Sequence, residues 1–165
     1  MVRAKGIVAA WRGRKHEDRF TRVYVVIWDS LESSQQFFTS AAYEEFWNTI
    51  QPALNGRKIH WTSHALIGVS ATNDATRFKS IIGSPAIEVA LTKVIEGGVS
   101  GYCDQFQRVV VPILNHEAGC EGYFISPQLE NPQQQILLIN WKSIDVRIQS
   151  HIKRIFIYHN LPNTY

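Results

Sequence analysis

The chain has 165 residues, of which 45% are apolar and 19% charged, so it can bury a core and global disorder is excluded. Its net charge of +3 is too small to indicate nucleic-acid binding by itself. No stretch approaches the ~18 consecutive apolar residues of a membrane span. The two cysteines are too few for a disulfide scaffold. We therefore expect a cytoplasmic protein of one domain or two small ones, without a membrane or nucleic-acid partner.

The first part of the chain predicts a β-hairpin that leads into a helix. Residues 6–11 and 23–28 are rich in apolar, β-branched and aromatic side chains, and a charged connection over residues 12–19 separates them. After the second run, Asp29 or Ser30 can cap a helix by accepting hydrogen bonds from the free N–H groups of its first turn.

The next stretch predicts an amphipathic helix with one aromatic side. Side chains of that side recur at Phe37, Ser40, Tyr43 and Phe46, and continue through Trp47 and Ile50. We expect a break near Ser40 and an end between Pro52 and Gly56. The apolar residues 59–67 then predict a further strand.

A polar segment rich in turn formers, residues 71–85, predicts a connection between two halves of the chain. The elements expected beyond it are, in order, a strand (86–94), a helix that Pro112 kinks or ends early (99–114), a hairpin (119–125 and 136–141), a helix capped by Ser143 and a terminal strand (155–158).

Two segments of the sequence are similar to each other. Val25–Glu32 reads VVIWDSLE and Leu138–Asp145 reads LINWKSID, so in each an apolar strand ends in Trp, followed by any residue, Ser, an aliphatic residue and an acid. This similarity predicts a duplication, with residues 1–70 and 86–165 as the two halves.

The pattern Trp-x-Ser-aliphatic-acid, followed by Phe-x-x-Ser-x-x-Tyr-x-x-Phe, resembles the antibiotic-biosynthesis-monooxygenase (ABM) group of the dimeric α/β-barrel superfamily. It is carried here by Trp28, Ser30, Leu31, Glu32, Phe37, Ser40, Tyr43 and Phe46. The resemblance covers about residues 6–67 well and 86–150 less well. It implies an α+β fold of ferredoxin-like β-α-β-β-α-β repeats whose antiparallel sheets form a dimeric α/β barrel, and a homodimer. The first half lacks the opening strand and helix of such a unit, so elements exchanged between halves or chains are a further hypothesis.

The same resemblance implies a cofactor-independent enzyme of the oxygenase, cyclase or isomerase type. Its substrate would be an aromatic or polyketide-like intermediate of natural-product biosynthesis. One alternative is a haem-binding or haem-degrading member of the superfamily, and another is a non-catalytic dimeric module that binds a hydrophobic ligand. The chain also departs from the group, since Ser34 and Arg147 occupy the places of a histidine often found early in the helix.

His60 and His64 are the candidates for proton transfer, because imidazole titrates near neutral pH. On a strand their Cα atoms would lie ~13 Å apart, too far to chelate one metal ion, so no metal site is expected. By resemblance, the walls of the substrate pocket would be Tyr43, Trp47, Trp61 and Tyr102. Arg12 would reach an acidic or phenolate group at the pocket mouth. For each aromatic residue, a role in the core is the alternative interpretation.

Overall fold

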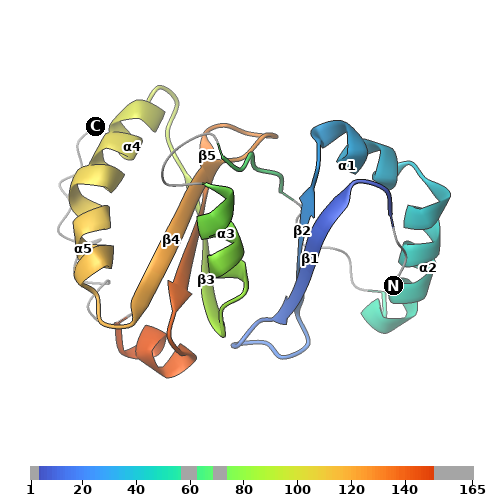
Figure 1. Cartoon of the computed structure of the whole chain (residues 1–165), viewed down its shortest axis with the longest axis horizontal. Helices are drawn as coiled ribbons and strands as arrows, with labels where there is room; N and C mark the ends of the chain where they lie inside the picture. The colour runs from blue at the N-terminus through green and yellow to red at the C-terminus, as the bar shows by residue number, and fades with distance from the viewer. Residues whose placement is uncertain (1–3, 57–62, 69–73, 151–165) are drawn as a thin grey trace. The chain divides into compact units, whose positions relative to one another are not determined.

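The computed structural model describes residues 4–56, 63–68 and 74–150 of the chain (Figure 1). The chain divides into two compact units, Met1–Thr62 and Ser63–Tyr165, which we call the N-terminal and the C-terminal unit. None of the described helices is long and apolar enough to cross a membrane.

The N-terminal unit consists of a hairpin and two helices. Strands β1 (Ile7–Arg14) and β2 (Arg22–Trp28) pair antiparallel, as expected. Helices α1 (Leu31–Phe38) and α2 (Ala41–Leu54) follow, so the expected break near Ser40 is confirmed.

Serine hydroxyls begin both of these helices. Ser30 Oγ accepts a hydrogen bond from Ser33 N, and Ser40 Oγ accepts one from Tyr43 N at 3.2 Å. Each bond satisfies a backbone N–H that the first helical turn leaves without a partner. Helix α2 ends at Asn55, which adopts a left-handed conformation with φ of 46°.

The C-terminal unit contains a three-stranded antiparallel sheet in the order β3-β5-β4. Its strands are β3 (Ala86–Lys93), β4 (Cys120–Pro127) and β5 (Gln134–Trp141). A long helical segment connects β3 to β4, and a further helix over residues 144–150 follows β5. This order follows the β-α-β-β-α part of the expected repeat. The predicted strand at 155–158 lies outside the described residues.

The helical segment between β3 and β4 consists of α4 (Val99–Gln105), a π-helical turn η1 (Phe106–Val110) and α5 (Val111–His116). Pro112 does not end the helix early, contrary to one expectation. It lies in the first turn of α5, and the wide π turn before it absorbs the irregularity that a residue without an N–H imposes.

Helices cover both faces of this sheet (Figure 1). On one face, buried side chains of β4 and β5, including Tyr123 and Trp141, pack with Phe106 and Leu114 from the helical segment. On the other face, Phe78 meets Phe124 with ring centroids 4.8 Å apart. Phe78 belongs to a helix that the sequence did not predict.

This helix, α3 (Ala75–Ile82), lies within the segment 71–85 that we expected to be a connection. Asp74 caps it by accepting a hydrogen bond from Arg77 N at 2.9 Å, and Phe78, Ile81 and Ile82 form a buried stripe. The helix was missed because its stripe is short and lies between turn-forming residues. We also expected a strand over residues 59–67. Its described part, residues 63–67, is not in a strand.

The two hairpins repeat each other in register. Ile7 pairs with Trp28 in the first, and Cys120 pairs with Trp141 in the second. In both, a bulge one residue further shifts the register, and the pairs beyond it then correspond one to one. The two similar segments thus end hairpins of the same register, while a duplication of the two halves of the chain stays a prediction.

Each hairpin closes in the same way. Asp29 N donates to Gly6 O and Lys142 N donates to Gly119 O, both at 2.9 Å. Both glycines have positive φ, +88° and +80°. A Cβ on Gly119 would lie 2.4 Å from Val146 Cγ1, so only glycine fits this approach of the strand to the following helix.

We expect Gly119→Ala to destabilise the C-terminal unit by about 3 kcal/mol, because it combines a strained φ with a clash in a packed corner. Gly101→Ala on α4 is the matched control, since a Cβ there meets nothing within 4 Å, and it should stabilise by about 0.5 kcal/mol. Urea unfolding measures both, and equal midpoints for the two variants would contradict this account.

Candidate functional site

One face of the β1-β2 hairpin is exposed, whereas the corresponding face of the β4-β5 hairpin in the C-terminal unit is buried. The side chains of Tyr24 and Val26 correspond in register to those of Leu137 and Ile139. The latter two are 6% and 2% exposed beneath the helical segment, whereas Tyr24 is 55% and Val26 37% exposed. Within residues 4–56, no helix corresponds to the segment that covers the C-terminal sheet.

Aromatic rings of β2, α1 and α2 gather on this side of the N-terminal unit. The ring of Trp28 lies 5.2 Å from that of Phe37, and Tyr24 meets Phe46 at 6.5 Å. Tyr43 meets Phe37 at 5.5 Å and Phe38 at 5.1 Å. We call these six residues the aromatic face: Tyr24, Trp28, Phe37, Phe38, Tyr43 and Phe46. No apolar side chain within residues 4–56 is fully buried, so the face offers rings to a flat ligand.

Arg12 adds a positive charge to the same side of the hairpin. It pairs with Tyr24 across the strands, and directly opposed residues project to the same face. Its counterpart in the C-terminal unit is Ile125, which is buried. A guanidinium therefore replaces a core side chain at the border of the aromatic face.

In the C-terminal unit, a carboxylate from β3 lies between the strand end and the last helix. Glu88 Oε2 accepts a hydrogen bond from the indole Nε1 of Trp141 at 3.2 Å and lies 3.7 Å from Arg147 Nε. Trp141 is fully buried and the Glu88 side chain is 15% exposed. The Trp141 indole, the Glu88 carboxylate and the Arg147 guanidinium thus form one polar network between the sheet and the last helix.

The corresponding residues of the N-terminal unit are Trp28 and Ser34. Ser34 is 2% exposed, and its hydroxyl has no hydrogen-bond partner among the described residues. The Trp28 indole also makes no hydrogen bond to a protein group in the described part of the chain, although Trp28 is only half-buried. Within residues 4–56 no carboxylate occupies the position of Glu88. The Ser34 hydroxyl is therefore a buried donor without a described acceptor, which is costly unless an acceptor is supplied.

His64 is held by Glu130 in the C-terminal unit. His64 Nδ1 is in contact with a Glu130 carboxylate oxygen, and the backbone N–H of His64 donates to both carboxylate oxygens at 3.1 and 3.2 Å. Burial raises the pKa of Glu130, but these hydrogen bonds from the His64 side chain and backbone outweigh it and bring that pKa below its ordinary value. A carboxylate that orients an imidazole in this way suits proton transfer.

The other predicted site residues lie apart from these groups or outside the described residues. Trp47 is half-buried on α2, and Tyr102 is half-buried on α4, where its ring meets Phe106 at 6.3 Å beside the C-terminal core. His60 and Trp61 lie outside the described residues. Tyr43, Trp47 and Arg12 are thus the predicted site residues that the structure describes in the N-terminal unit, with Tyr43 and Trp47 four residues apart on α2.

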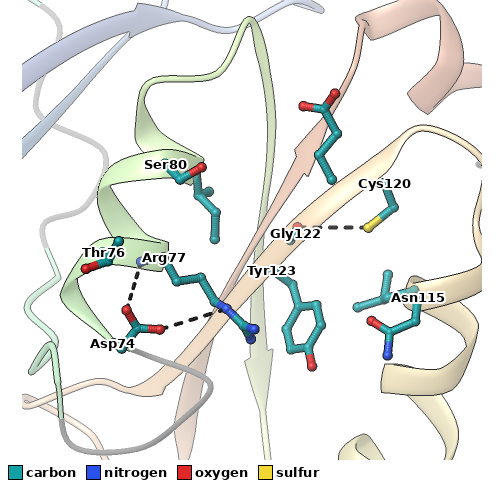
Figure 2. A pocket seen from close by; sticks show the side chains of 11 residues that line it. Asp74, Thr76, Arg77, Ser80, Asn115, Cys120, Gly122 and Tyr123 are labelled. Carbon is teal, nitrogen blue, oxygen red and sulfur yellow. Dashed lines mark hydrogen bonds and ion pairs between the residues drawn. The ribbon is translucent and has the colours of Figure 1, made fainter.

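A polar groove in the C-terminal unit was not found by sequence reasoning. It has a volume of about 470 Å³ and lies between the start of α3, the end of α5 and the first half of β4 (Figure 2). Arg77, Asn115 and Tyr123 are among its lining residues. Because α3 was expected to be a connection, no sequence pattern pointed to this groove.

Metal and thiol chemistry find little support in the described residues. No three His, Cys, Asp or Glu side chains gather there into a group that could hold a metal ion. The pKa of the Cys103 thiol is raised by burial and by the neighbouring Asp104 carboxylate, which makes this thiol a poor nucleophile.

No protein-family model and no curated protein matches the sequence. Two solved structures are similar to the chain, and both proteins are named "putative monooxygenase". The one from Fusobacterium nucleatum subsp. nucleatum ATCC 25586 has a TM-score of 0.50 at 12% identity, over 87% of this chain and 63% of that one. The one from Lactobacillus acidophilus NCFM has a TM-score of 0.47 at 7% identity, over 87% and 64%.

At such identities the likeness concerns the fold. The chain is an α+β protein with antiparallel sheets that resembles these structures in architecture. It spans less than two thirds of the length of either protein. The expected α+β class with antiparallel sheets is confirmed, and the dimeric barrel stays a prediction.

The hydrogen bonds of Glu130 predict a dependence of stability on pH. Since its pKa in the folded protein is lowered from the ordinary value of 4.5, the ionised carboxylate stabilises the fold above that pH. The contribution disappears as the pH falls through the lower, folded-state pKa. The carboxylate is 45% exposed, so the effect is about 1 kcal/mol or less.

Glu130→Gln should therefore lower the melting temperature at pH 7 but not at pH 3. Calorimetry at both pH values measures this, with Glu96→Gln, at an exposed position, as a charge-matched control that should leave both temperatures unchanged. A melting-temperature difference for Glu130→Gln that persists undiminished at pH 3 would refute the assignment.

Proposed function

We propose that the chain is a cofactor-independent small-molecule enzyme of the oxygenase type that binds a flat aromatic substrate on the aromatic face. Cyclisation and isomerisation of the same class of substrate are the neighbouring reactions. The observation that carries the proposal is the pair of donors, Trp28 Nε1 and Ser34 Oγ, for which the described residues supply no acceptor, whereas the C-terminal unit holds Glu88 beside the corresponding Trp141.

The geometry favours a substrate with an oxygen acceptor at one end of a flat ring system. Exposed rings of the aromatic face would contact the ring system, and dispersion together with apolar burial would supply most of the affinity. A carbonyl, carboxylate or phenolate oxygen would accept hydrogen bonds from Trp28 and Ser34. Arg12 would stabilise negative charge that develops on the substrate.

These contacts suit oxygenation of an electron-rich phenol or enol. Loss of a proton from such a substrate gives an anion that can react with dioxygen, so the protein needs to hold the ring, favour the anion and accept the proton. Of the two predicted proton acceptors, His60 belongs to the same unit as the aromatic face, whereas His64, which Glu130 orients, belongs to the C-terminal unit. The name of the two similar structures is consistent with this class of reaction, although their likeness to this chain concerns the fold.

Binding is tested by calorimetry with 2-naphthoate and with 2-methylnaphthalene, which has the same ring system but no acceptor. We expect Ser34→Ala to weaken naphthoate binding about fivefold without lowering the melting temperature, because the removed hydroxyl has no protein partner. Arg12→Ala should also weaken it about fivefold, while Arg19→Ala, a charge-matched control in the hairpin loop, should not.

Turnover is tested with 1,8-dihydroxyanthrone in an oxygen electrode, where each anthrone and dioxygen yield one anthraquinone and one water. Replacing both His60 and His64 by alanine should abolish oxygen uptake and leave naphthoate binding unchanged. Naphthoate binding without turnover of any phenolic substrate would instead indicate a ligand-binding module. Failure of both naphthalene compounds to bind would contradict the proposal.

We also propose that the chain works as a homodimer. A two-stranded sheet alone is marginal in water, and within residues 4–56 no apolar side chain is fully buried. A second copy would supply the missing apolar contacts. Native mass spectrometry at micromolar concentration should find twice the 18.9 kDa mass of the chain, and a monomer at that concentration would refute a stable dimer.

A further inference from the structure

The groove of the C-terminal unit contains charged and polar side chains with few partners of their own. The Arg77 side chain is 41% exposed and forms an ion pair with Asp74, 3.9 Å from Nε to Oδ2. The Tyr123 side chain lines the floor of the groove and is 7% exposed. Among the described residues, no group forms a hydrogen bond with the Tyr123 hydroxyl or with the Asn115 amide.

The position of Arg77 is fixed from two sides. Its backbone N–H is bound by the Asp74 carboxylate that caps α3, and its guanidinium carbon lies 5.3 Å from the centre of the Tyr123 ring. Figure 2 shows the guanidinium beside this ring, with the Asn115 side chain on the other side of it. The cation–π contact holds the guanidinium over the groove rather than out in solvent.

The charges around the groove define what can bind there. Arg77 is accompanied by two carboxylates, Asp74 and Glu121. A simple anion would be repelled by the carboxylates, and a simple cation would be repelled by Arg77. A ligand that carries both charges satisfies both, with its carboxylate on the Arg77 guanidinium and its ammonium group near Asp74.

The backbone at the groove favours a small molecule over an added peptide strand. β4 is the outer strand of the described sheet, and such edges can pair with extended peptides. Here, however, a bulge between Cys120 and Gly122 interrupts the regular ladder, which disfavours continued strand pairing. At Gly122 a side chain would meet only Ile81, at 3.9 Å, so the floor has room.

We propose that this groove binds a free zwitterionic amino acid with an uncharged polar side chain. The carboxylate binds Arg77, the ammonium group binds Asp74, and the side chain forms hydrogen bonds with the Tyr123 hydroxyl and the Asn115 amide. The groove volume of about 470 Å³ lies within the range of small-molecule sites. This site is separate from the aromatic face, and its test does not depend on the proposed enzyme activity.

The test is calorimetry on the full chain with L-serine, L-threonine, L-asparagine and L-glutamine. At least one should bind. Its N-acetyl derivative, which lacks the ammonium group, and its amide, which lacks the carboxylate, should each bind at least about tenfold more weakly. If none of the four binds, or if a blocked derivative binds as well as the parent, the proposal is wrong.

Single substitutions then test which residues of the groove bind the ligand. Arg77→Ala should weaken binding about tenfold, and Asp74→Asn should do so about threefold while keeping the helix cap, since asparagine caps as well as aspartate. Tyr123→Phe should weaken binding about threefold. Arg108→Ala on η1 is the charge-matched control and should change nothing. Unchanged affinity in Arg77→Ala would place the binding elsewhere and overturn the assignment.

Discussion

An antiparallel sheet can bury an apolar face only if another layer covers it, and this requirement separates the two units of the chain. In the C-terminal unit, the helical segment from Val99 to His116 supplies the cover, and Ile139 and Trp141 are almost completely buried. In the N-terminal unit, the same hairpin with the same register has no such helix within residues 4–56, and Tyr24 and Val26 are exposed. One unit therefore has a closed core, whereas the aromatic rings of the other are only partly covered within residues 4–56.

The repeated motif also explains which polar groups differ between the units. In both, a glycine with positive φ accepts the N–H that follows the tryptophan, and a serine caps the next helix. The C-terminal unit then joins Trp141 to Arg147 through Glu88, a satisfied network of the kind that stabilises a core. The N-terminal unit keeps the tryptophan, but the Ser34 hydroxyl has no hydrogen-bond partner among the described residues. The polar groups that form a network in one unit thus do not form one in the described part of the other.

Much of this arrangement could be predicted from the sequence, because strong local signals agree with it. Apolar runs predicted both hairpins, Ser40 predicted the break between α1 and α2, and the two Trp-x-Ser segments lie at corresponding places of the two hairpins. Helix α3 was missed because its apolar stripe, Phe78, Ile81 and Ile82, spans little more than one turn among turn formers. The partners of polar groups could not be predicted either. Glu88 is distant in sequence from Trp141 and Arg147, and only the sheet register brings it close to them.

The most direct test of the central claim is a crystal structure of the chain with 2-naphthoate. The account predicts the naphthalene ring against Tyr24 and the neighbouring rings, with its carboxylate within hydrogen-bond distance of Trp28 Nε1 and Ser34 Oγ. It would be contradicted by naphthoate bound away from the aromatic face. It would also be contradicted if a carboxylate of the protein itself, from this chain or from a second copy, already accepted the hydrogen bonds of these two donors.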